Sequence, residues 1–461
     1  MRRGGWPIRK SSQSSFELDF GTSPAGCYWK RAIREITNDH FIDDRELFRS
    51  MMAEEEIGKT QDSVEVNKIK KRVFEEAIDE FRKVFGEVKI EELRAGISPG
   101  RVNLIGDHVD YVDGFVLPIA LPLYTIAVAR PVKSINQNFT QIHSTHFKET
   151  AKFYHYKEDD DAENRLQKWA HYAEGIFELH RPNQPLDVIL HTNIPVGAGL
   201  SSSASVELAL YYLFDQFNDV HLSTEKIAML CQKAEHEYAG VPCGIMDQFV
   251  CSLAHVGHAL KIDCSNLAYD RIPLAISRDA SFIVVDSGVK HALASGEYAK
   301  RRAAVEQTLQ VIMGARSWRD VTEAHLAEYS PELSQEERNC AKHVVGEISR
   351  TNQASEALLD NNIKLFGELM WESHESLKNL YRVSCIELDK LVDIAKSCEG
   401  VWGARMTGGG FGGCIVALVK NSKINEFKKS IEENYSGRPR FFDGHPVNGG
   451  QILDIAELLK N

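Results

Sequence analysis

The sequence lacks the features that define several protein classes. Its nine cysteines are scattered and none forms a Cys-x-x-Cys pair, which gives no zinc signature and suits a reducing compartment. The longest apolar run, residues 115–129, contains two prolines and is too short to span a bilayer. The net charge of −12 argues against nucleic acid as the main partner, because neutralising its phosphates requires clustered cations. A nucleotide needs only a local group of donors and is not excluded.

The N-terminal residues also lack the pattern of a targeting helix. The first sixteen residues carry four basic residues and several serines, a composition that is typical of transit peptides. Gly4, Gly5 and Pro7 would interrupt the amphipathic helix that such a peptide forms. We therefore expect a cytoplasmic protein in which residues 1–62 are a partly disordered extension.

The size and composition predict a globular protein of two to three domains. The chain has 461 residues, of which 43% are hydrophobic and 26% are charged. Helical and strand patterns alternate along it, which indicates an α+β or α/β class in two lobes. We place the lobes at residues 63–275 and 276–461.

The first of these lobes begins with a clear pattern of elements. Apolar residues at helical spacing predict a helix over residues 66–84, capped by Ser63 and ended by Gly86. Strands are expected at 93–97 and 117–128, with a polar loop between them.

A glycine- and serine-rich segment, residues 195–205, comes directly before an apolar, helix-forming run. Gly197 and Gly199 lead into Ser201, Ser202 and Ser203. A glycine-rich loop that opens a helix presents unpaired N–H groups and a positive dipole end to an anion. There is no Gly-Lys-Ser/Thr, so the segment is not a Walker A loop. Taken alone, it is equally well interpreted as a loop before a serine-capped helix.

A second polar cluster lies in residues 98–111, between two glycines and two predicted strands. Arg101, Asp107, His108 and Asp110 fall within ten positions. Carboxylates and imidazoles in this density suit the vicinal hydroxyls of a sugar, and an arginine could stabilise a transferred phosphoryl group. The alternative is a surface loop with local ion pairs.

A third segment, residues 235–252, carries a lone carboxylate where a helix is expected to begin. Asp247 is interpreted either as a general base for an acceptor hydroxyl or as an N-cap. Gly244 permits close approach of another group to the backbone. Glu235 is either a metal ligand or a solvent-facing helix residue.

Two further patterns are less specific. Five glycines within residues 408–413 suit a backbone that packs against another loop or a ligand, whereas a tight hairpin would need only two. Trp169 and Tyr172 could form an apolar adenine pocket, but a pair at this helical spacing is also typical of core packing.

The glycine-centred motifs, in this order and spacing, resemble those of the GHMP kinases of sugars and small molecules and, within them, the galactokinase family. The motifs are Gly-Arg-Val-Asn-Leu-Ile-Gly, Gly-Leu-Ser-Ser-Ser-Ala-Ser, Cys-Gly-Ile-Met-Asp-Gln-Phe and Met-Thr-Gly-Gly-Gly-Phe-Gly-Gly-Cys. The resemblance extends from about residue 70 to the C-terminus. It implies an α+β fold with an N-terminal S5-like α/β lobe, a C-terminal ferredoxin-like lobe, and a site between them.

The resemblance also implies a reaction: ATP-dependent phosphorylation of the anomeric hydroxyl of D-galactose, with ATP and Mg²⁺ required and no nucleic acid or membrane partner. Asp247 would be the base and Arg101 would steady the phosphoryl group. The residues that would hold the sugar are Arg101, Asp107, His108, Asp110, Gly244, Asp247 and Tyr298. Gly197, Gly199, Ser201 and Ser202 would hold the ATP phosphates, and Trp169 and Tyr172, from their spacing, are the candidates for the adenine. Ser203 and Glu235 would be the Mg²⁺ ligands.

Two departures from the family pattern keep alternatives open. Asp107 stands where the family usually has glutamate, so its carboxylate is one methylene shorter. If it under-reaches the sugar, Asp107→Glu should lower the KM for galactose. The alternatives are a kinase for a modified galactose, such as N-acetylgalactosamine or galacturonate, and a non-catalytic sensor of galactose and ATP. The N-terminal extension has no counterpart in the family core.

Overall fold

The computed structural model describes residues 44–134, 136–156, 166–290 and 294–460, with no side chains described for 44–63 and 290–299. Residues 1–61 and 62–461 form separate compact units, and the second unit carries the architecture below apart from residues 44–61 of the first helix. Most of the predicted extension lies outside the described residues, so its disorder stays a prediction. Within the described part of the chain, none of the helices combines the length and hydropathy that crossing a membrane requires.

The helix that precedes the first sheet begins earlier than the sequence predicts. Helix α2 runs over Asp44–Phe85 and passes through Ser63, so the predicted cap is wrong. The preceding run carries four glutamates and two methionines, which are strong helix formers and continue the helix. Gly86 does end it, with a backbone φ of +80° that favours glycine.

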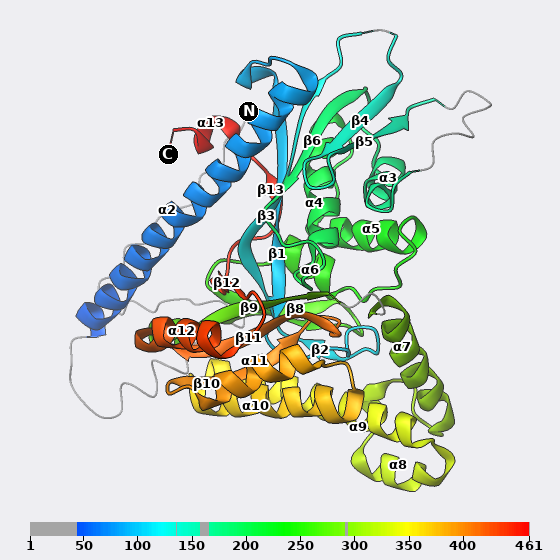
Figure 1. Cartoon of the computed structure of the whole chain (residues 1–461), viewed down its shortest axis with the longest axis vertical. Coiled ribbons are helices and arrows are strands. Elements are labelled where there is room, and N and C mark those ends of the chain that lie inside the picture. Colours follow the sequence, from blue (N-terminus) through cyan, green and yellow to red (C-terminus); the bar gives the residue numbers. More distant parts are fainter. Residues whose placement is uncertain (1–43, 135, 157–165, 291–293, 461) are drawn as a thin grey trace, which may run out of the picture. The chain divides into compact units, whose positions relative to one another are not determined.

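The first sheet has six strands in the order β13-β1-β3-β6-β4-β5 (Figure 1). The strands are β1 (Arg94–Asn103), β3 (Pro118–Pro131), β4 (Phe139–Ser144), β5 (Glu149–Tyr154), β6 (Leu186–Thr192) and β13 (Gln451–Ile452). The chain therefore returns to this sheet at its C-terminal end, where Ile452 pairs with Gly96. The predicted strand at 93–97 is too short, because pairing with β3 continues to Asn103 past an irregularity at Pro99/Gly100.

Helices cover both faces of this sheet. Lys70 of α2 lies over the ring of Tyr124 on β3, and Arg130 of β3 lies over Phe81 of α2. The opposite face carries α4 (Ser202–Phe214), against which Gly96 packs so closely that a Cβ there would lie 2.2 Å from the Ala209 carbonyl oxygen. The remaining helices of this lobe are α3 (Ala170–Leu179), α5 (Thr224–Glu237) and α6 (Met246–Leu253).

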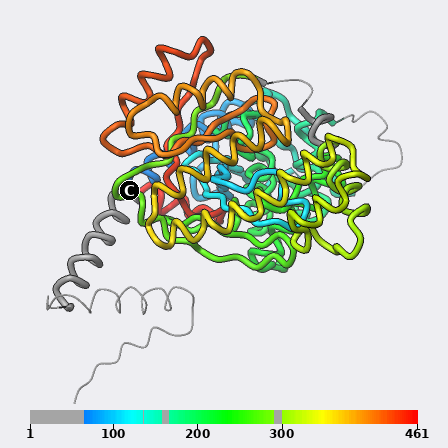
Figure 2. The backbone as a smooth tube through the Cα atoms, turned by 90° about the horizontal axis from the view of Figure 1, so that it is seen from below, coloured from blue at the N-terminus to red at the C-terminus, as the bar shows by residue number. Residues whose placement is uncertain are grey.

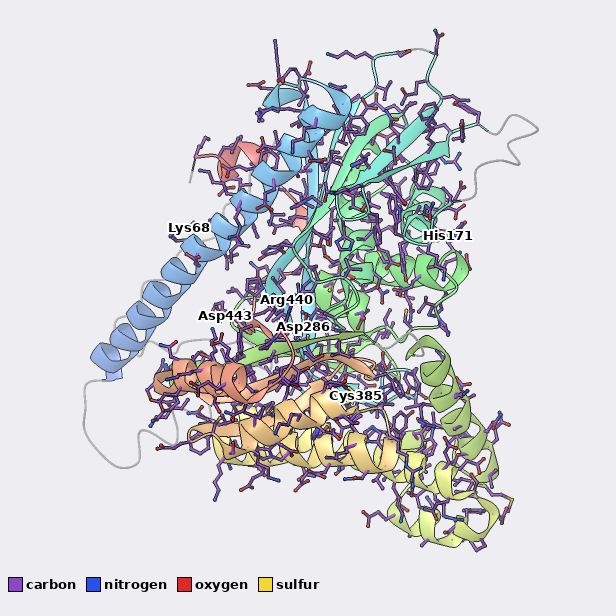
Figure 3. The ribbon with its side chains drawn as sticks, viewed as in Figure 1. Lys68, His171, Asp286, Cys385, Arg440 and Asp443 are labelled. Atoms are coloured by element: carbon purple, nitrogen blue, oxygen red, sulfur yellow. The ribbon has the colours of Figure 1, made fainter. Side chains whose placement is uncertain are left out.

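The second lobe is built on a four-stranded antiparallel sheet in the order β10-β11-β9-β12. These strands are β9 (Ala280–Lys290), β10 (Val401–Thr407), β11 (Gly412–Lys420) and β12 (Arg440–Asp443). With helices after β9 and β11, the chain order is the βαββαβ pattern of a ferredoxin-like lobe. Arg440 and Asp286, labelled in Figure 3, join β12 to β9 through a hydrogen bond of 3.1 Å from Nε. The predicted two-lobed α+β class is confirmed.

Helices complete the second lobe, and a small sheet lies beside the first. Helices α9 (Gln335–Leu359) and α10 (Ile363–Ser376) pack side by side below the four-stranded sheet (Figure 1, Figure 2). The others are α7 (Ala294–Val311), α8 (Glu323–Glu328), α11 (Ile386–Ser397) and α12 (Ile424–Asn434), whereas α13 (Ile455–Leu458) follows β13 and lies beside the first sheet (Figure 1). The small sheet joins β2 (Phe115–Val116), β7 (His258–Asp263) and β8 (Ala268–Pro273). The boundary at 275/276 stays a prediction.

The contact between β1 and α4 gives a test of the packing. Gly96→Ala would place Cβ 2.2 Å from the Ala209 oxygen and 2.5 Å from the Leu213 nitrogen, and backbone atoms cannot move aside as a side chain can. We expect a loss of about 3 kcal/mol in the free energy of unfolding, measured with urea. In the control Gly314→Ala, Cβ would meet nothing within 4 Å at a φ of +86°, so only backbone strain of about 1 kcal/mol is expected. Equal losses in the two variants would contradict the close packing.

Candidate active site

The predicted phosphate-binding loop connects β6 to α4 and has the backbone that glycine permits. Gly197 and Gly199 have φ values of +75° and +77°. Ser201, at the N-cap position, also lies in the left-handed region, with φ 57° and ψ 47°, and its side chain does not cap the helix. The serine-capped helix that was the alternative interpretation is therefore wrong. The first-turn N–H groups of α4 remain available to an anion.

The glycine cluster of the second lobe packs directly on this loop. A Cβ at Gly408 would lie 3.1 Å from the Gly199 carbonyl oxygen, and one at Gly413 would lie 2.8 Å from the Ala198 oxygen. Both residues have φ values above +75°. The five glycines thus form the hairpin between β10 and β11 and also permit contact with the phosphate loop, which is the packing function expected from the sequence.

Arg101, Asp247 and Ser201 meet at one point. Arg101 lies on β1 and donates through Nε to Asp247 Oδ1 at 2.8 Å, with Nη2 2.6 Å from the same oxygen. Its Nη1 donates to the Gly199 carbonyl at 2.5 Å. Ser201 Oγ donates to Asp247 Oδ2 at 2.5 Å. Asp247 follows the N-cap Ile245 by two residues and makes no capping bond, so the capping alternative is wrong.

Asp110 and Gly244 are also brought together. A Cβ at Gly244 would lie 1.8 Å from Asp110 Oδ2, so the carboxylate occupies space that only glycine leaves open. Burial, with the negative charges of Asp247 and Asp107, raises the pKa of Asp110 to about 7. The carboxylates of Asp110 and Asp247 therefore act on each other at the same site.

Asp107 and His108 have partners that the sequence analysis did not identify. The Asp107 carboxylate is buried, with Oδ2 2.6 Å from Arg405 Nη1, while Oδ1 accepts from the Gly408 N–H at 3.0 Å. His108 has a φ of 63°, and its Nδ1 lies 2.9 Å from the Tyr111 hydroxyl. Burial and the neighbouring His343 lower the pKa of His108 to about 3, so the imidazole is neutral.

The predicted metal ligands lie in a buried polar cluster. Burial and the charge of Asp247 raise the pKa of Glu235 to about 7, and Ser203 hydrogen-bonds to its carboxylate. Gln248 donates to Glu235 at 2.7 Å and to Glu207 at 3.2 Å. Glu207 and Gln248 were not expected from the sequence. A single glutamate inside the apolar run of α4 was the available signal for the first.

A magnesium ion fits the donor set of this cluster. Hydroxyl and carboxylate oxygens are the ligands that Mg²⁺ prefers, and it commonly takes one or two carboxylates together with substrate phosphates. No group of three or more His, Cys, Asp or Glu side chains is arranged to hold a metal by itself in the ranges that the structure describes. The protein would therefore supply only part of the coordination.

The remaining predicted residues are less closely connected to this centre. Trp169 is buried, donates from Nε1 to Glu149 at 3.0 Å, and stacks on Phe147 with an interplanar angle of 8°. Tyr172 lies near the buried glutamates, whose charges, after burial itself, raise its pKa. Tyr298 lies on α7, but its side chain is outside the described residues.

A set of residues from the second lobe surrounds the polar loop that follows β1. No role was expected for them from the sequence, because each is far from the loop along the chain. They are His343, Glu347, Ser373, Tyr381 and Arg405.

Family models match three parts of the chain. Residues 79–131 match the galactokinase galactose-binding signature, residues 164–255 match the GHMP kinases N terminal domain, and residues 354–437 match the GHMP kinases C terminal domain. The fold and the matched segments define the class: the chain is a member of the GHMP kinases.

Curated relatives give the family within that class. The chain is 40% identical over 397 residues to galactokinase from Canis lupus familiaris, covering 82% of this chain and 97% of the relative. It is 41% identical over 366 residues to galactokinase from Chloroflexus aggregans, covering 78% and 91%. The structure of Lactococcus lactis galactokinase complexed with galactose matches with a TM-score of 0.75 at 30% identity, covering 81% of this chain and 98% of that one. The chain belongs to the galactokinase family.

The raised pKa of Asp110 predicts a pH-dependent stability. An acid whose pKa is higher in the folded state holds its proton more tightly there, so its contribution to stability is full below 3.8 and falls as the pH rises to about 7. Asp110→Asn removes this loss. Between about pH 4 and about pH 8 the variant should gain at least about 1 kcal/mol on the unmodified protein in urea unfolding.

The control for this prediction is Asp443→Asn, since the Asp443 side chain is 73% exposed. Its difference from the unmodified protein should stay constant across the same pH range. A difference for Asp110→Asn that also stays constant would contradict the burial of that carboxylate against Asp247.

Proposed function

We propose that this chain transfers the γ-phosphoryl group of ATP to the anomeric hydroxyl of D-galactose, giving galactose 1-phosphate and ADP. The observation that carries the proposal is the position of the Asp247 carboxylate. It bonds to Arg101, at the start of residues 101–111, which we call the sugar-binding segment, and to Ser201 in the phosphate loop. One carboxylate is thus held where an acceptor hydroxyl and a terminal phosphate would meet. The kinship with galactokinases supports galactose as the acceptor.

Asp247 is suited to receive or orient the acceptor hydroxyl. Oδ1 lies against both Nε and Nη2 of Arg101, whereas Oδ2 accepts from Ser201 and retains a lone pair for a further donor. The sugar hydroxyl would donate to this carboxylate and attack the phosphorus as the bond to the ADP oxygen breaks. Arg101 is paired with Asp247 Oδ1 and would stabilise negative charge on the transferring phosphoryl group.

The proposed sugar contacts come from two segments. His108, Asp110 and Gly244 would line the sugar together with Tyr298. A neutral His108 can both donate and accept, and the carboxylate of Asp110 can pair with vicinal hydroxyls. Because each unmet polar group in a buried site is costly, this set would discriminate between sugars.

The proposed nucleotide site uses mainly backbone groups. The loop through Gly197, Gly199, Ser201 and Ser202 would receive the phosphates at the start of α4. The Ser201 hydroxyl already donates to Asp247, so its N–H is the group that faces the anion in this proposal. Trp169 and Tyr172 would bound the adenine.

Mg²⁺ would be held by Ser203 and Glu235 together with phosphate oxygens. When bound, it would neutralise charge on the phosphates. The protein contributes the rest of the chemistry by positioning, because little covalent change is required of its side chains. A cytoplasmic location stays part of this proposal.

The test is ADP release from ATP with a panel of sugars. D-galactose should support turnover, with galactose 1-phosphate identified by mass spectrometry. Two other sugars in the panel, N-acetylgalactosamine and galacturonate, test for a modified substrate, and the assay without sugar measures background ATP hydrolysis. Phosphorylation of N-acetylgalactosamine but not galactose would overturn the proposal. Binding of galactose and ATP without turnover would make the chain a sensor instead.

The variant Asp247→Ala tests the role of the central carboxylate. Turnover should fall by a factor of about 10³, since general-base assistance and the alignment of Arg101 are lost together. ATP affinity, measured by calorimetry without sugar, should remain close to that of the unmodified protein. Asp443→Ala, with its side chain exposed on β12, is the matched control and should retain full turnover. Undiminished turnover in Asp247→Ala would remove this residue from the mechanism.

A further inference from the structure

Three buried charged residues lie beside the proposed site without belonging to it. Arg405 and Glu347 are 0% exposed and Asp107 is 2% exposed. Arg405 Nη1 is 2.6 Å from Asp107 Oδ2, and Arg405 Nη2 is 3.7 Å from Glu347 Oε1. We call these three residues the Arg405 cluster. Burying such charges is costly, and replacing them with apolar residues is often neutral or stabilising. A role in positioning would explain their presence.

The Arg405 cluster bonds to the backbone at the end of β1 and at the start of the polar loop that follows it. Arg405 Nη1 donates to the carbonyls of Asn103 and Leu104, at 3.4 and 3.3 Å. Glu347 Oε1 accepts from the Gly106 N–H at 3.0 Å. These bonds fix Asn103, Leu104 and Gly106, a few residues before His108 and Asp110.

Two neighbours strengthen this attachment. His343 lies on the same helix as Glu347, and its Nε2 is 3.2 Å from the Asp107 carbonyl oxygen. Thr407, two residues after Arg405, donates through Oγ1 to the Asn103 carbonyl at 2.9 Å. The sugar-binding segment is therefore attached to α9 and β10 of the second lobe.

The same strand also reaches the phosphate loop. The glycine hairpin begins where β10 ends, and Gly408 donates its N–H to Asp107 Oδ1 at 3.0 Å. A Cβ at Gly408 would be 3.1 Å from the Gly199 oxygen. Gly408 thus contacts the sugar-binding segment on one side and the phosphate loop on the other.

We propose that Asp107 and Arg405 form a positioning pair that sets the sugar-binding segment relative to the phosphate loop. Asp107 acts through Arg405 and Gly408, and not by contact with the sugar. This inference rests on the proposed function and adds to it a role for residues that touch neither substrate. The sugar hydroxyl and the γ-phosphoryl group would be held by these two segments. A displacement near 1 Å of one segment relative to the other can reduce the rate by about a hundredfold.

The proposal reverses the expected effect of lengthening Asp107. Both carboxylate oxygens of Asp107 have partners in the protein, Arg405 and Gly408. The length of the aspartate side chain is therefore matched to these partners and is not too short. Asp107→Glu adds a methylene to a fully packed position and should displace the segment. We expect the KM for galactose to rise, whereas a sugar contact that falls short predicts a lower KM.

A double-mutant cycle tests the pair. Asp107→Asn, Arg405→Lys and the double variant are assayed for kcat and for the KM of galactose, and ATP affinity is measured by calorimetry. Each single variant should reduce kcat/KM for galactose by about thirtyfold, with ATP affinity within about twofold. The double variant should be no worse than the poorer single variant, because both changes break one interaction. Effects that multiply would show that Asp107 acts independently of Arg405 and would overturn the proposal.

Controls separate the possible failures. Arg350→Lys is the matched change, because Arg350 Nε donates to Glu347 at 2.8 Å but makes no bond to the sugar-binding segment. It should leave kcat/KM within about twofold. Thermal unfolding checks that each variant is folded, and Glu347→Gln replaces Arg405→Lys in the cycle if the latter does not fold. The unmodified protein is assayed first, so that absent galactose turnover there overturns the proposed function, whereas multiplying effects in an active protein overturn only the pair.

Discussion

The ion pair between Arg101 and Asp247 is the interaction on which the site depends. Arg101 is buried on a sheet strand, and a buried guanidinium without a partner would be strongly destabilising. Its partner is on α6, and both residues also bond to the phosphate loop, Arg101 through the Gly199 carbonyl and Asp247 through Ser201. A strand, a helix and a loop are thus held together by one pair of opposite charges. The carboxylate proposed to meet the substrate is also a structural element, which restricts its rotamer before any ligand binds.

Glycine makes this convergence possible, because the segments meet backbone to backbone. A Cβ at Gly100 would lie 2.7 Å from the Leu200 carbonyl oxygen, where β1 meets the end of the phosphate loop. Gly244 leaves space for Asp110, and Gly408 and Gly413 leave space for the phosphate loop. In each case the neighbouring group is a main-chain oxygen or a carboxylate. The glycine-rich motifs are therefore explained by close approaches between segments as much as by contacts with a ligand.

Local patterns in the sequence were sufficient for the parts of the fold that are determined locally. The phosphate loop, the glycine hairpin and the helix end at Gly86 follow from glycine, whose backbone conformations other residues rarely adopt. The start of α2 and the length of β1 were missed, since the first depends on propensity without periodicity and the second on pairing with β3. Arg101 and Asp247 were identified by residue type, but their contact across 146 positions could not be derived from either segment.

The roles of Ser201 and Asp107 show a different limit. A serine before a helix is most simply interpreted as a cap, and only the left-handed backbone at Ser201 turns its hydroxyl toward Asp247. Asp107 stands in a polar loop beside candidate sugar ligands, so its partner was expected to be the ligand. Its actual partner, Arg405, is nearly 300 positions away and was visible in the sequence only as the residue before a glycine-rich motif.

The backbone to which the Arg405 cluster bonds explains why the cluster is charged. Asn103 and Leu104 are fully buried; the Asn103 carbonyl also accepts from Thr407, but the Leu104 carbonyl left without Arg405 would cost about 1–3 kcal/mol. An apolar replacement could fill the volume of Arg405 but could not supply these donors. Arg405 donates to both carbonyls and Glu347 accepts from Gly106, so the charges neutralise one another while completing the bonding of the segment. The comparison with an apolar core therefore favours the charged cluster here, because beyond the last β1–β3 pair at Asn103 the Leu104 N–H and the Ile105 carbonyl bond to Leu117, while the Leu104 carbonyl takes its donor from Arg405.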